Sequence, residues 1–300
     1  MNLPTVRQLR YFLALVEHGH FGRAAAASFV SQSAFSSAIK ELEGVLGVRL
    51  VDRTNRQVTI TAVGRNVAAR ARDCLARLED LVESAHGQRN PLEGELRLGV
   101  IPTVAPFMLP SLLPKLRRAY PKLRLFLTEG QTQPLHERLL DGEVDLVLLA
   151  LPYELKGAEI LPLFEDRFLL AYRENTKLVD PQNYRLSRLE PATVLLLDDG
   201  HCLREHAIDA CRLRNSEKLS PFAATSLLTL IEMVDADLGI TYLPEMAIGR
   251  GLLAHTRVKT HALGAGSVRT IGLAWRKGSA RVAEFELFGR FVSASRREPA

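Results

Sequence analysis

Two cysteines, Cys202 and Cys211, have the type and spacing of a redox-active pair. Cys202 stands at the predicted start of a helix, between His201 and Arg204. A helix N-terminus and neighbouring cations both favour a thiolate. A thiolate attacks peroxide to give a sulfenic acid, which a second thiol converts to a disulfide. The segment therefore predicts thiol chemistry, with Cys211 as the second thiol.

The spacing of the two cysteines sets a condition on that chemistry. On one continuous helix, α-carbons nine positions apart are separated by about 13 Å. A disulfide tolerates roughly 7 Å at most, so a bond between Cys202 and Cys211 would require the intervening segment to unwind. The alternative is that both are inert core residues, which the apolar neighbours Ile208 and Ala210 of Cys211 would also suit.

The third cysteine, Cys74, falls on an apolar helical seam, where a buried thiol commonly acts as a small apolar residue, so we assign it no redox role. Three scattered cysteines are too few for a disulfide scaffold. The histidines and cysteines show no close ligand spacing beyond His201–Cys202 and Cys202–His206. No nucleotide fingerprint or nucleophile elbow is present either. We expect that the protein binds no metal and no cofactor and that it is not an enzyme.

The cysteine pair lies in a segment that predicts an α/β fold. Strand-like stretches at 95–101, 123–127 and 145–151 alternate with helix-like stretches at 105–119 and 132–141, which is typical of a parallel sheet. Further strands near 168–172, 193–197, 240–243 and 269–275 suffice for two lobes. Ligands of such folds bind at strand carboxyl ends or between lobes, which points to Thr103, 131–133 and the loop after Leu197. Thr103 and Thr132 could equally be helix caps.

The N-terminal residues predict a helix-turn-helix. Apolar residues at helical spacing give a first helix that ends near Gly19, and alanines give a second over 21–28. Ser31 can cap a third helix that stops near Gly47. Its apolar stripe consists of Phe35, Ile39, Leu42 and Leu46, and its outward residues, which we expect to read base edges, are Gln32, Ser33, Ser36, Ser37 and Lys40. A solvated helix of another small bundle is the alternative.

The next residues, 48–60, predict two short strands around an arginine-rich turn, which is the wing of a winged helix. We expect Arg53 and Arg56 to contact phosphates. Residues 1–72 hold ten Lys or Arg and four Asp or Glu, whereas the whole chain has a net charge of only +5. The positive charge therefore belongs to the N-terminal end, which suits a DNA partner.

A connecting helix is predicted from Ala62 to about His86, with Thr61 as its cap. The seam Val67, Ala71, Cys74, Leu78, Leu81 and Ala85 repeats in steps of four and three, which favours pairing with a second copy. Packing against the same chain is the alternative. Residues 90–94, Asn-Pro-Leu-Glu-Gly, end this helix. The expected domains are 1–61, 62–90 and 91–300, the last with lobe I about 91–164 and 271–300 and lobe II about 165–270.

The composition predicts a soluble cytoplasmic protein. Apolar residues make up 47% and charged residues 24%. No apolar run approaches the roughly 18 residues that span a membrane. The N-terminus lacks the pattern of a secretory signal.

Residues 7–54, RQLRYFLALVEHGHFGRAAAASFVSQSAFSSAIKELEGVLGVRLVDRT, resemble the signature of the LysR family of transcription regulators in order and spacing. The stretches GVIPTVAPFMLP, LLLDDGHCLREHAIDAC and ATSLLTLIEMV resemble the peroxide-sensing OxyR branch of that family. The resemblance implies an N-terminal winged helix-turn-helix, a long linker helix and a two-lobed periplasmic-binding-protein-like effector domain.

The same resemblance implies roles for individual residues. Cys202 would be the peroxide-reacting residue and Cys211 the resolving one. Thr103, Thr132 and His201 would line the peroxide pocket, with Arg269 in support. The implied partners are promoter DNA, hydrogen peroxide as signal, RNA polymerase, a thiol reductant and further copies of the chain in a dimer or tetramer that activates transcription in the oxidative stress response.

The sequence departs from the family pattern at three places. Ser33 stands where many members have proline, and Gln133 stands where some have histidine. The stretch 234–239, with Asp235 and Asp237, is more acidic than usual. We therefore carry over no base-reading pattern, and peroxide reactivity and its coupling can differ.

Two other functions stay open at this point. A LysR regulator that binds a small metabolite between its lobes would leave Cys202 dispensable. A cysteine-dependent peroxidase would have no need for a basic winged helix, so we place it last.

Overall fold

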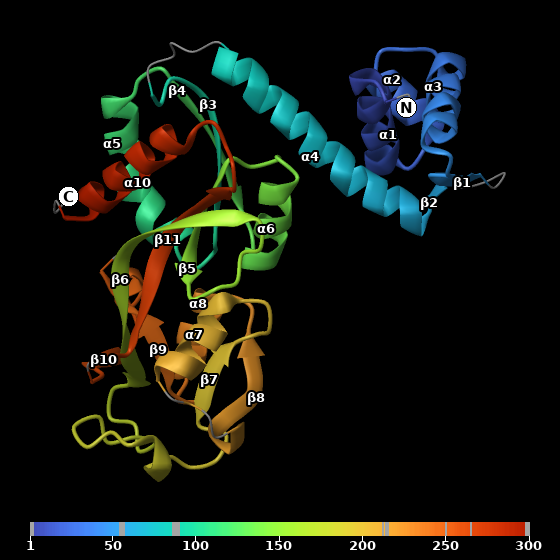
Figure 1. Cartoon of the computed structure of the whole chain (residues 1–300). Coiled ribbons are helices and arrows are strands. Elements are labelled where there is room, and N and C mark those ends of the chain that lie inside the picture. Colours follow the sequence, from blue (N-terminus) through green and yellow to red (C-terminus); the bar gives the residue numbers. More distant parts are fainter. Residues whose placement is uncertain are drawn as a thin grey trace. The chain divides into compact units, whose positions relative to one another are not determined.

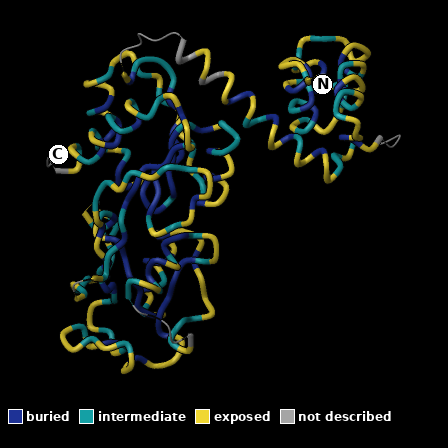
Figure 2. The backbone as a smooth tube through the Cα atoms, in the orientation of Figure 1, coloured by how far each residue is buried: buried dark blue, intermediate teal, exposed yellow. Residues whose placement is uncertain are grey.

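The computed structural model describes residues 3–53, 58–85, 91–211, 213, 216–249, 251–264 and 266–297. The chain forms two compact units, residues 1–88 and 89–300 (Figure 1). Each unit has its own buried core, drawn dark blue in Figure 2.

The N-terminal unit has three short helices, α1 (Val6–His18), α2 (Phe21–Ala27) and α3 (Gln32–Leu46). Local caps set these bounds: Thr5 and Gln8 form a capping box on α1, Ser31 caps α3, and Gly19 and Gly47 end α1 and α3 in the left-handed region. The three predicted helices and their ends are confirmed. Their buried core includes Phe12, Leu15, Phe35, Ile39 and Leu42.

The turn between α2 and α3 contains Phe29 at φ +56°, with 96% of its side chain exposed. The strands β1 (Val51–Arg53) and β2 (Val58–Ile60) then pair antiparallel, which confirms the predicted wing. The tip of the wing, with Arg56, lies outside the described residues, as does the side chain of Arg53.

The long helix α4 (Ala62–Ala85) starts at Thr61, whose hydroxyl accepts a hydrogen bond from the Gly64 amide. Its first turns pack into the core of their own unit through Ala68, Ala71 and Leu75. Further along, the predicted seam is uncovered within the chain: Cys74 is exposed, and Leu78 and Leu81 are 36% and 62% exposed.

The C-terminal unit is built on a seven-stranded sheet in the order β10-β6-β11-β5-β3-β4, with β9 beside β6. Its strands are β3 (Gly94–Val100), β4 (Leu123–Glu129), β5 (Leu146–Leu151), β6 (Ala158–Arg173), β9 (Thr241–Pro244), β10 (Val258–Ala262) and β11 (Val268–Arg276). β3 is parallel to β4 and β5, but β11 is antiparallel to β5 and β6. The parallel pairing expected for the strands at 95–101, 123–127 and 145–151 is therefore confirmed, whereas β11 runs antiparallel because it returns to the first lobe from the second.

Two hydrophobic cores divide this unit into lobes. The first contains β3, β5, α5 (Ala105–Ala119) and α10 (Val282–Arg297), and α6 (Thr132–Leu140) packs on it. The second contains β7 (Val194–Leu197), α7 (Cys202–Ala210), α8 (Leu227–Asp235) and β9, with β8 (Leu219–Ala224), α9 (Glu245–Ile248) and two 3-10 turns, Leu186–Arg188 and Ser216–Lys218, around them. The long strands β6 and β11 run through both lobes (Figure 1).

Candidate redox site and DNA-binding surface

Cys202 lies where the two lobes meet. It is the first residue of α7, with His201 at the N-cap position, and it is buried. Its side chain belongs to the core of the first lobe, whereas the next residue, Leu203, belongs to the core of the second. α7 therefore begins at the boundary between the lobes, and its start at Cys202 is the one that the sequence predicted.

Burial controls the protonation of Cys202. It raises the pKa of the thiol above its ordinary value, although the Thr132 hydroxyl, the Arg269 guanidinium and nearby backbone amides each lower it. The expected thiolate is therefore not favoured in the resting protein. The Arg204 guanidinium has other partners: it contacts Asp199 at 3.1 Å and donates to the Leu197 carbonyl at 3.1 Å.

Arg269, on β11, donates hydrogen bonds to residues of other elements near this thiol. It is 1% exposed. Its Nε donates to Asp166 Oδ2 at 3.0 Å, its Nη1 to Thr103 Oγ1 at 3.0 Å and its Nη2 to the Thr103 carbonyl at 3.1 Å. Two of the predicted pocket residues, Thr103 and Arg269, thus lie in direct contact.

Thr132 is the other threonine of the site, and its hydroxyl is free to bind a ligand. It is 2% exposed. Its Oγ1 makes no hydrogen bond of normal geometry within the described residues, yet it lies near enough to Cys202 to lower the thiol pKa. Neither threonine is a helix cap, since Val104 caps α5 and Gln131 caps α6. A buried hydroxyl without a partner suits a small polar ligand.

His201 and Gln133 border the site. The His201 Nε2 lies 3.4 Å from Asp198 Oδ1. Gln133 is exposed and links Tyr153, whose hydroxyl donates to it at 2.9 Å, with Glu137. Burial first, and then the charges of Cys202 and Glu137, raise the pKa of Tyr153, which places this tyrosine near the thiol.

Cys211 lies at the other end of α7, as its C-cap. It packs against the core of the second lobe, and burial raises its pKa to about 12. α7 is continuous from Cys202 to Ala210, and both thiols are free. By helix geometry their α-carbons are therefore about 13 Å apart, which is too far for a disulfide.

Sequence reasoning missed two residues of this site. Asp166, the partner of Arg269, lies opposite it in the β6–β11 ladder and could be found only from the strand register. His206 is buried and its Nε2 lies 2.9 Å from the Pro152 carbonyl. Its spacing of four from Cys202 on a predicted helix was a visible signal for proximity, but it suggested only metal binding.

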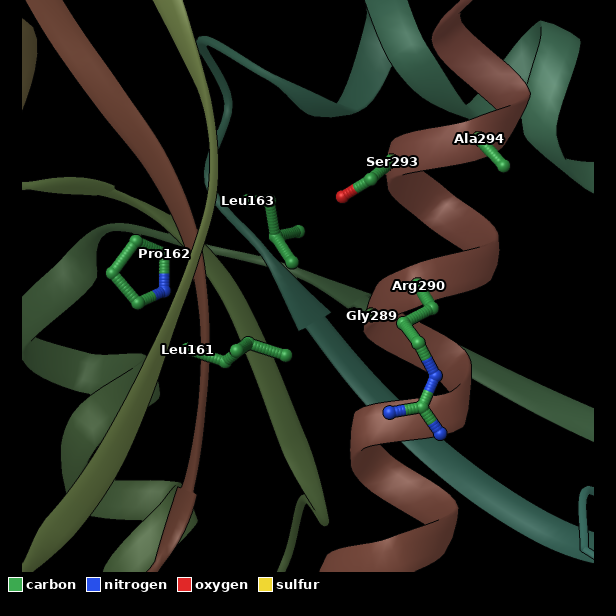
Figure 3. Close-up of a pocket in the computed structure, with 7 residues that line it drawn as sticks. All are labelled: Leu161, Pro162, Leu163, Gly289, Arg290, Ser293 and Ala294. Atoms are coloured by element: carbon green, nitrogen blue, oxygen red, sulfur yellow. The ribbon is translucent and has the colours of Figure 1, made fainter.

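A separate hollow of about 450 Å³ lies between β6 and α10 (Figure 3). It is lined by Leu161, Pro162, Leu163, Gly289, Arg290, Ser293 and Ala294. Gly289 allows the helix to approach, because a Cβ there would lie 2.7 Å from Leu161. None of the predicted site residues lines this hollow.

The N-terminal unit presents a polar helix face. On α3, Gln32, Ser33, Ser37 and Lys40 are exposed and Ser36 is half-buried. Ser33 lies near the helix start, with its hydroxyl 3.1 Å from that of Ser31. Such a face at the second helix of a helix-turn-helix is the one that enters the major groove.

No helix within the described ranges is long and apolar enough to cross a membrane. In the same part of the chain, His, Cys, Asp and Glu form no group of three or more suited to a metal ion.

Two family models match the chain. The bacterial regulatory helix-turn-helix protein model of the lysR family matches residues 6–65, and the LysR substrate binding domain model matches residues 89–297.

Relatives of known name match over nearly the whole length. The HTH-type transcriptional regulator EstR of Acinetobacter baylyi is 38% identical over 95% of both chains. A probable hydrogen peroxide-inducible genes activator of Streptomyces viridosporus is 42% identical over 94% of this chain and 91% of its own. The full-length structure of an OxyR variant from Pseudomonas aeruginosa is 29% identical, with a TM-score of 0.80 over all of both chains.

These matches agree with the fold on both sides of residue 88. They confirm the predicted arrangement of an N-terminal helix-turn-helix and a two-lobed α/β regulatory unit. The chain therefore belongs to the LysR family of DNA-binding transcription regulators, and it resembles the members named OxyR.

Proposed function

We propose that this chain is a peroxide-responsive transcription regulator in which Cys202 is the sensor. The observation that carries the proposal is the setting of this thiol: it is buried at a lobe boundary beside the Arg269 guanidinium and the Thr132 hydroxyl, which has no other hydrogen-bond partner within the described residues. A hydroxyl and a cation can hold a small polar oxidant against the sulfur and stabilise the charge that develops as the O–O bond breaks. Thr103 orients the arginine from the other side, and His201 borders the pocket.

The chemistry proceeds in two balanced steps. The Cys202 sulfur attacks one oxygen of hydrogen peroxide, the O–O bond breaks, and sulfenic acid and water form. The Cys211 sulfur then displaces the sulfenic oxygen as a second water, and a disulfide forms. Both cysteines are oxidised and the peroxide is reduced. A thiol reductant of the cell would restore the two thiols.

The second step, formation of the disulfide, requires a conformational change in α7. α7 has to unwind before the sulfurs can meet, because the helix holds them about 13 Å apart. Residues between the cysteines, such as Leu203 and Ala207, are part of the second lobe's core, so unwinding removes them from it. Oxidation would thus refold part of this lobe and alter contacts between copies of the chain, and through them promoter binding.

The remaining assignments follow from the family architecture. We assign residues 1–61 to DNA binding, 62–90 to a linker that pairs with a second copy through its exposed seam, and 91–300 to sensing, with lobe I about 91–164 and 271–300 and lobe II about 165–270. A dimer would present two reading heads to a two-fold operator in the cytoplasm, and pairs of dimers would form the tetramer. RNA polymerase is the expected partner at the promoter.

The test is non-reducing peptide mass spectrometry after brief exposure to low peroxide. We expect a crosslink between Cys202 and Cys211 within seconds, its absence in Cys202→Ser, and its persistence in the matched variant Cys74→Ser. Free thiols at both positions in the unsubstituted protein would exclude the sensor role. The protein would then be a LysR regulator whose small-molecule ligand lies between its lobes.

A further inference from the structure

His206 is a buried histidine that lies one helical turn beyond Cys202 on α7. It is 4% exposed. Its Nε2 is 2.9 Å from the Pro152 carbonyl oxygen, whereas its Nδ1 is buried and has no hydrogen-bond partner within the described residues. A carbonyl oxygen can only accept, so Nε2 carries the ring proton. Nδ1 therefore holds a free lone pair in the interior of the protein.

The helix places His206 on the same face of α7 as the sensor thiol. Residues four apart lie on one face of a helix, with their Cβ atoms about 5–6 Å apart. Helical side chains also lean toward the N-terminus, which is the direction of Cys202 from His206. Both residues contact the same segment, since Cys202 meets the Ala150 backbone and His206 meets Pro152.

The proposed chemistry needs a proton acceptor at this place. Burial keeps Cys202 in its thiol form, and the thiol has to lose its proton in order to attack peroxide. Arg269 offers only donors, and the His201 Nε2 lies 3.4 Å from Asp198 Oδ1.

The charges around His206 keep its ring neutral. Burial is the largest effect and lowers its pKa, and Arg269 on β11 lowers it further. The hydrogen bond to Pro152 and the charge of Asp209 on α7 act in the opposite direction but do not outweigh burial. The ring is therefore available as a base at neutral pH.

We propose that Nδ1 of His206 accepts the proton of Cys202 when peroxide is attacked. The S–H proton moves to Nδ1 while the sulfur bonds to one peroxide oxygen and the O–O bond breaks. The departing hydroxide then takes the proton from the imidazolium and leaves as water, so the ring returns to its neutral form. The inference rests on the proposed reaction of Cys202 with peroxide.

The test measures sulfenic acid formation as a function of pH in the full-length protein. Cys211→Ser serves as the parent, so that the sulfenic acid persists and can be trapped with dimedone and counted by mass spectrometry. His206→Gln keeps an N–H for the Pro152 carbonyl but provides no base. We expect this variant to react on the order of 100-fold more slowly at pH 7 and to recover as rising pH ionises the thiol directly.

His136→Gln is the matched control. His136 is also buried on a helix, and its Nε2 lies 2.9 Å from the Lys156 carbonyl. It should react like the parent. An unchanged rate and pH profile in His206→Gln would overturn the role of His206 and leave the sensor role of Cys202 intact. A parent that forms no sulfenic acid would overturn both.

A second measurement does not depend on a variant. Nitrogen NMR of the unoxidised protein should show His206 as the neutral tautomer protonated at Nε2. A ring protonated at Nδ1 at neutral pH would exclude it as the acceptor, whatever the stability of the glutamine variant.

Discussion

The guanidinium of Arg269 and the carboxylate of Asp166 form an ion pair 2.9 Å long in which both side chains are 0% exposed. The two residues face each other across β11 and β6, the strands that pass through both lobes. Asp166 also accepts a hydrogen bond from the Met246 amide at 3.0 Å. The pair thus holds β6, β11, α9 and Thr103 in one arrangement.

Breaking this pair should cost more stability than replacing it. Arg269→Met leaves a buried carboxylate without its partner, and we expect a loss of about 3–5 kcal/mol in the free energy of unfolding. Arg269→Met combined with Asp166→Leu should recover a large part of that loss, because no buried charge remains. Urea unfolding of the single and double variants measures the difference, and equal losses in both would contradict this account.

Cys211 should be nearly inert toward alkylation in the folded protein. With a pKa of about 12, its thiolate fraction at pH 8.5 is on the order of 1,000-fold below that of an unfolded chain. Iodoacetamide labelling with and without urea, followed by mass spectrometry, gives the ratio. Labelling at the same rate in both states would show that the thiol is not shielded by the fold.

The same shift predicts a loss of stability at alkaline pH. The native pKa of Cys211 is raised above the ordinary value of 9.0, so its contribution is complete below that value. It is lost as pH rises toward 12, because the unfolded chain ionises first. Cys211→Ala should therefore show a shallower decline of the free energy of unfolding across this range than the unsubstituted protein shows.

Phe29 should be replaceable by glycine with a gain in stability. Its φ of +56° is unfavourable for an L-residue, and its side chain is 96% exposed and buries almost nothing. Phe29→Gly should stabilise the N-terminal unit by about 1 kcal/mol. Phe222→Gly is the control, since Phe222 is 70% exposed on β8 and has no positive φ, and there glycine should destabilise. The midpoint temperatures of thermal unfolding of both variants, compared with that of the unsubstituted protein, test this prediction.

The wing arginines should act on all DNA alike. Replacing Arg53 or Arg56 by alanine should weaken binding to specific and random duplexes and reduce the slope of log affinity against log salt by about 1 for each residue. Ser37→Ala, on the exposed face of α3, should change sequence preference with little effect on that slope. An unchanged slope in both arginine variants would exclude phosphate contacts.

The exposed part of the α4 seam should be needed for self-association. Leu81 is 62% exposed, so Leu81→Glu should not disturb the fold of the single chain but should place a charge in the paired helices. We expect a shift from dimer to monomer in sedimentation experiments. Ala69→Glu, at an exposed position off the seam, should leave the dimer intact.

The N-terminal unit could be predicted almost residue by residue because its signals are local. Ser31, Gly19 and Gly47 mark helix ends through contacts within one turn, and the sequence shows them directly. The regulatory unit yielded its alternation of strands and helices for the same reason. The antiparallel return of β11 did not follow, because strand order depends on contacts between residues far apart in the chain.

The sequence indicated which residues belong to the candidate site better than it indicated the protonation state of Cys202. Thr103, Thr132 and Arg269 do gather near Cys202, but their grouping came from a resemblance and not from the pattern. The protonation of Cys202 was misjudged because a helix start and a neighbouring arginine are visible in sequence, whereas burial and the pairing of Arg204 with Asp199 are tertiary facts. β8 and β10 were missed for a similar reason, since partners distant in the chain hold both strands.

The unbroken helix α7 also has a consequence for the timing of the proposed oxidation. If Cys202 reacts with peroxide as proposed, its sulfenic acid cannot meet Cys211 until the helix opens, so the opening time of α7 would set the lifetime of the sulfenic acid. During that interval a second peroxide can oxidise the same sulfur to the irreversible sulfinic acid. In that mechanism the stability of the nine-residue helix α7 would set the peroxide flux above which Cys202 is oxidised irreversibly before the disulfide can form.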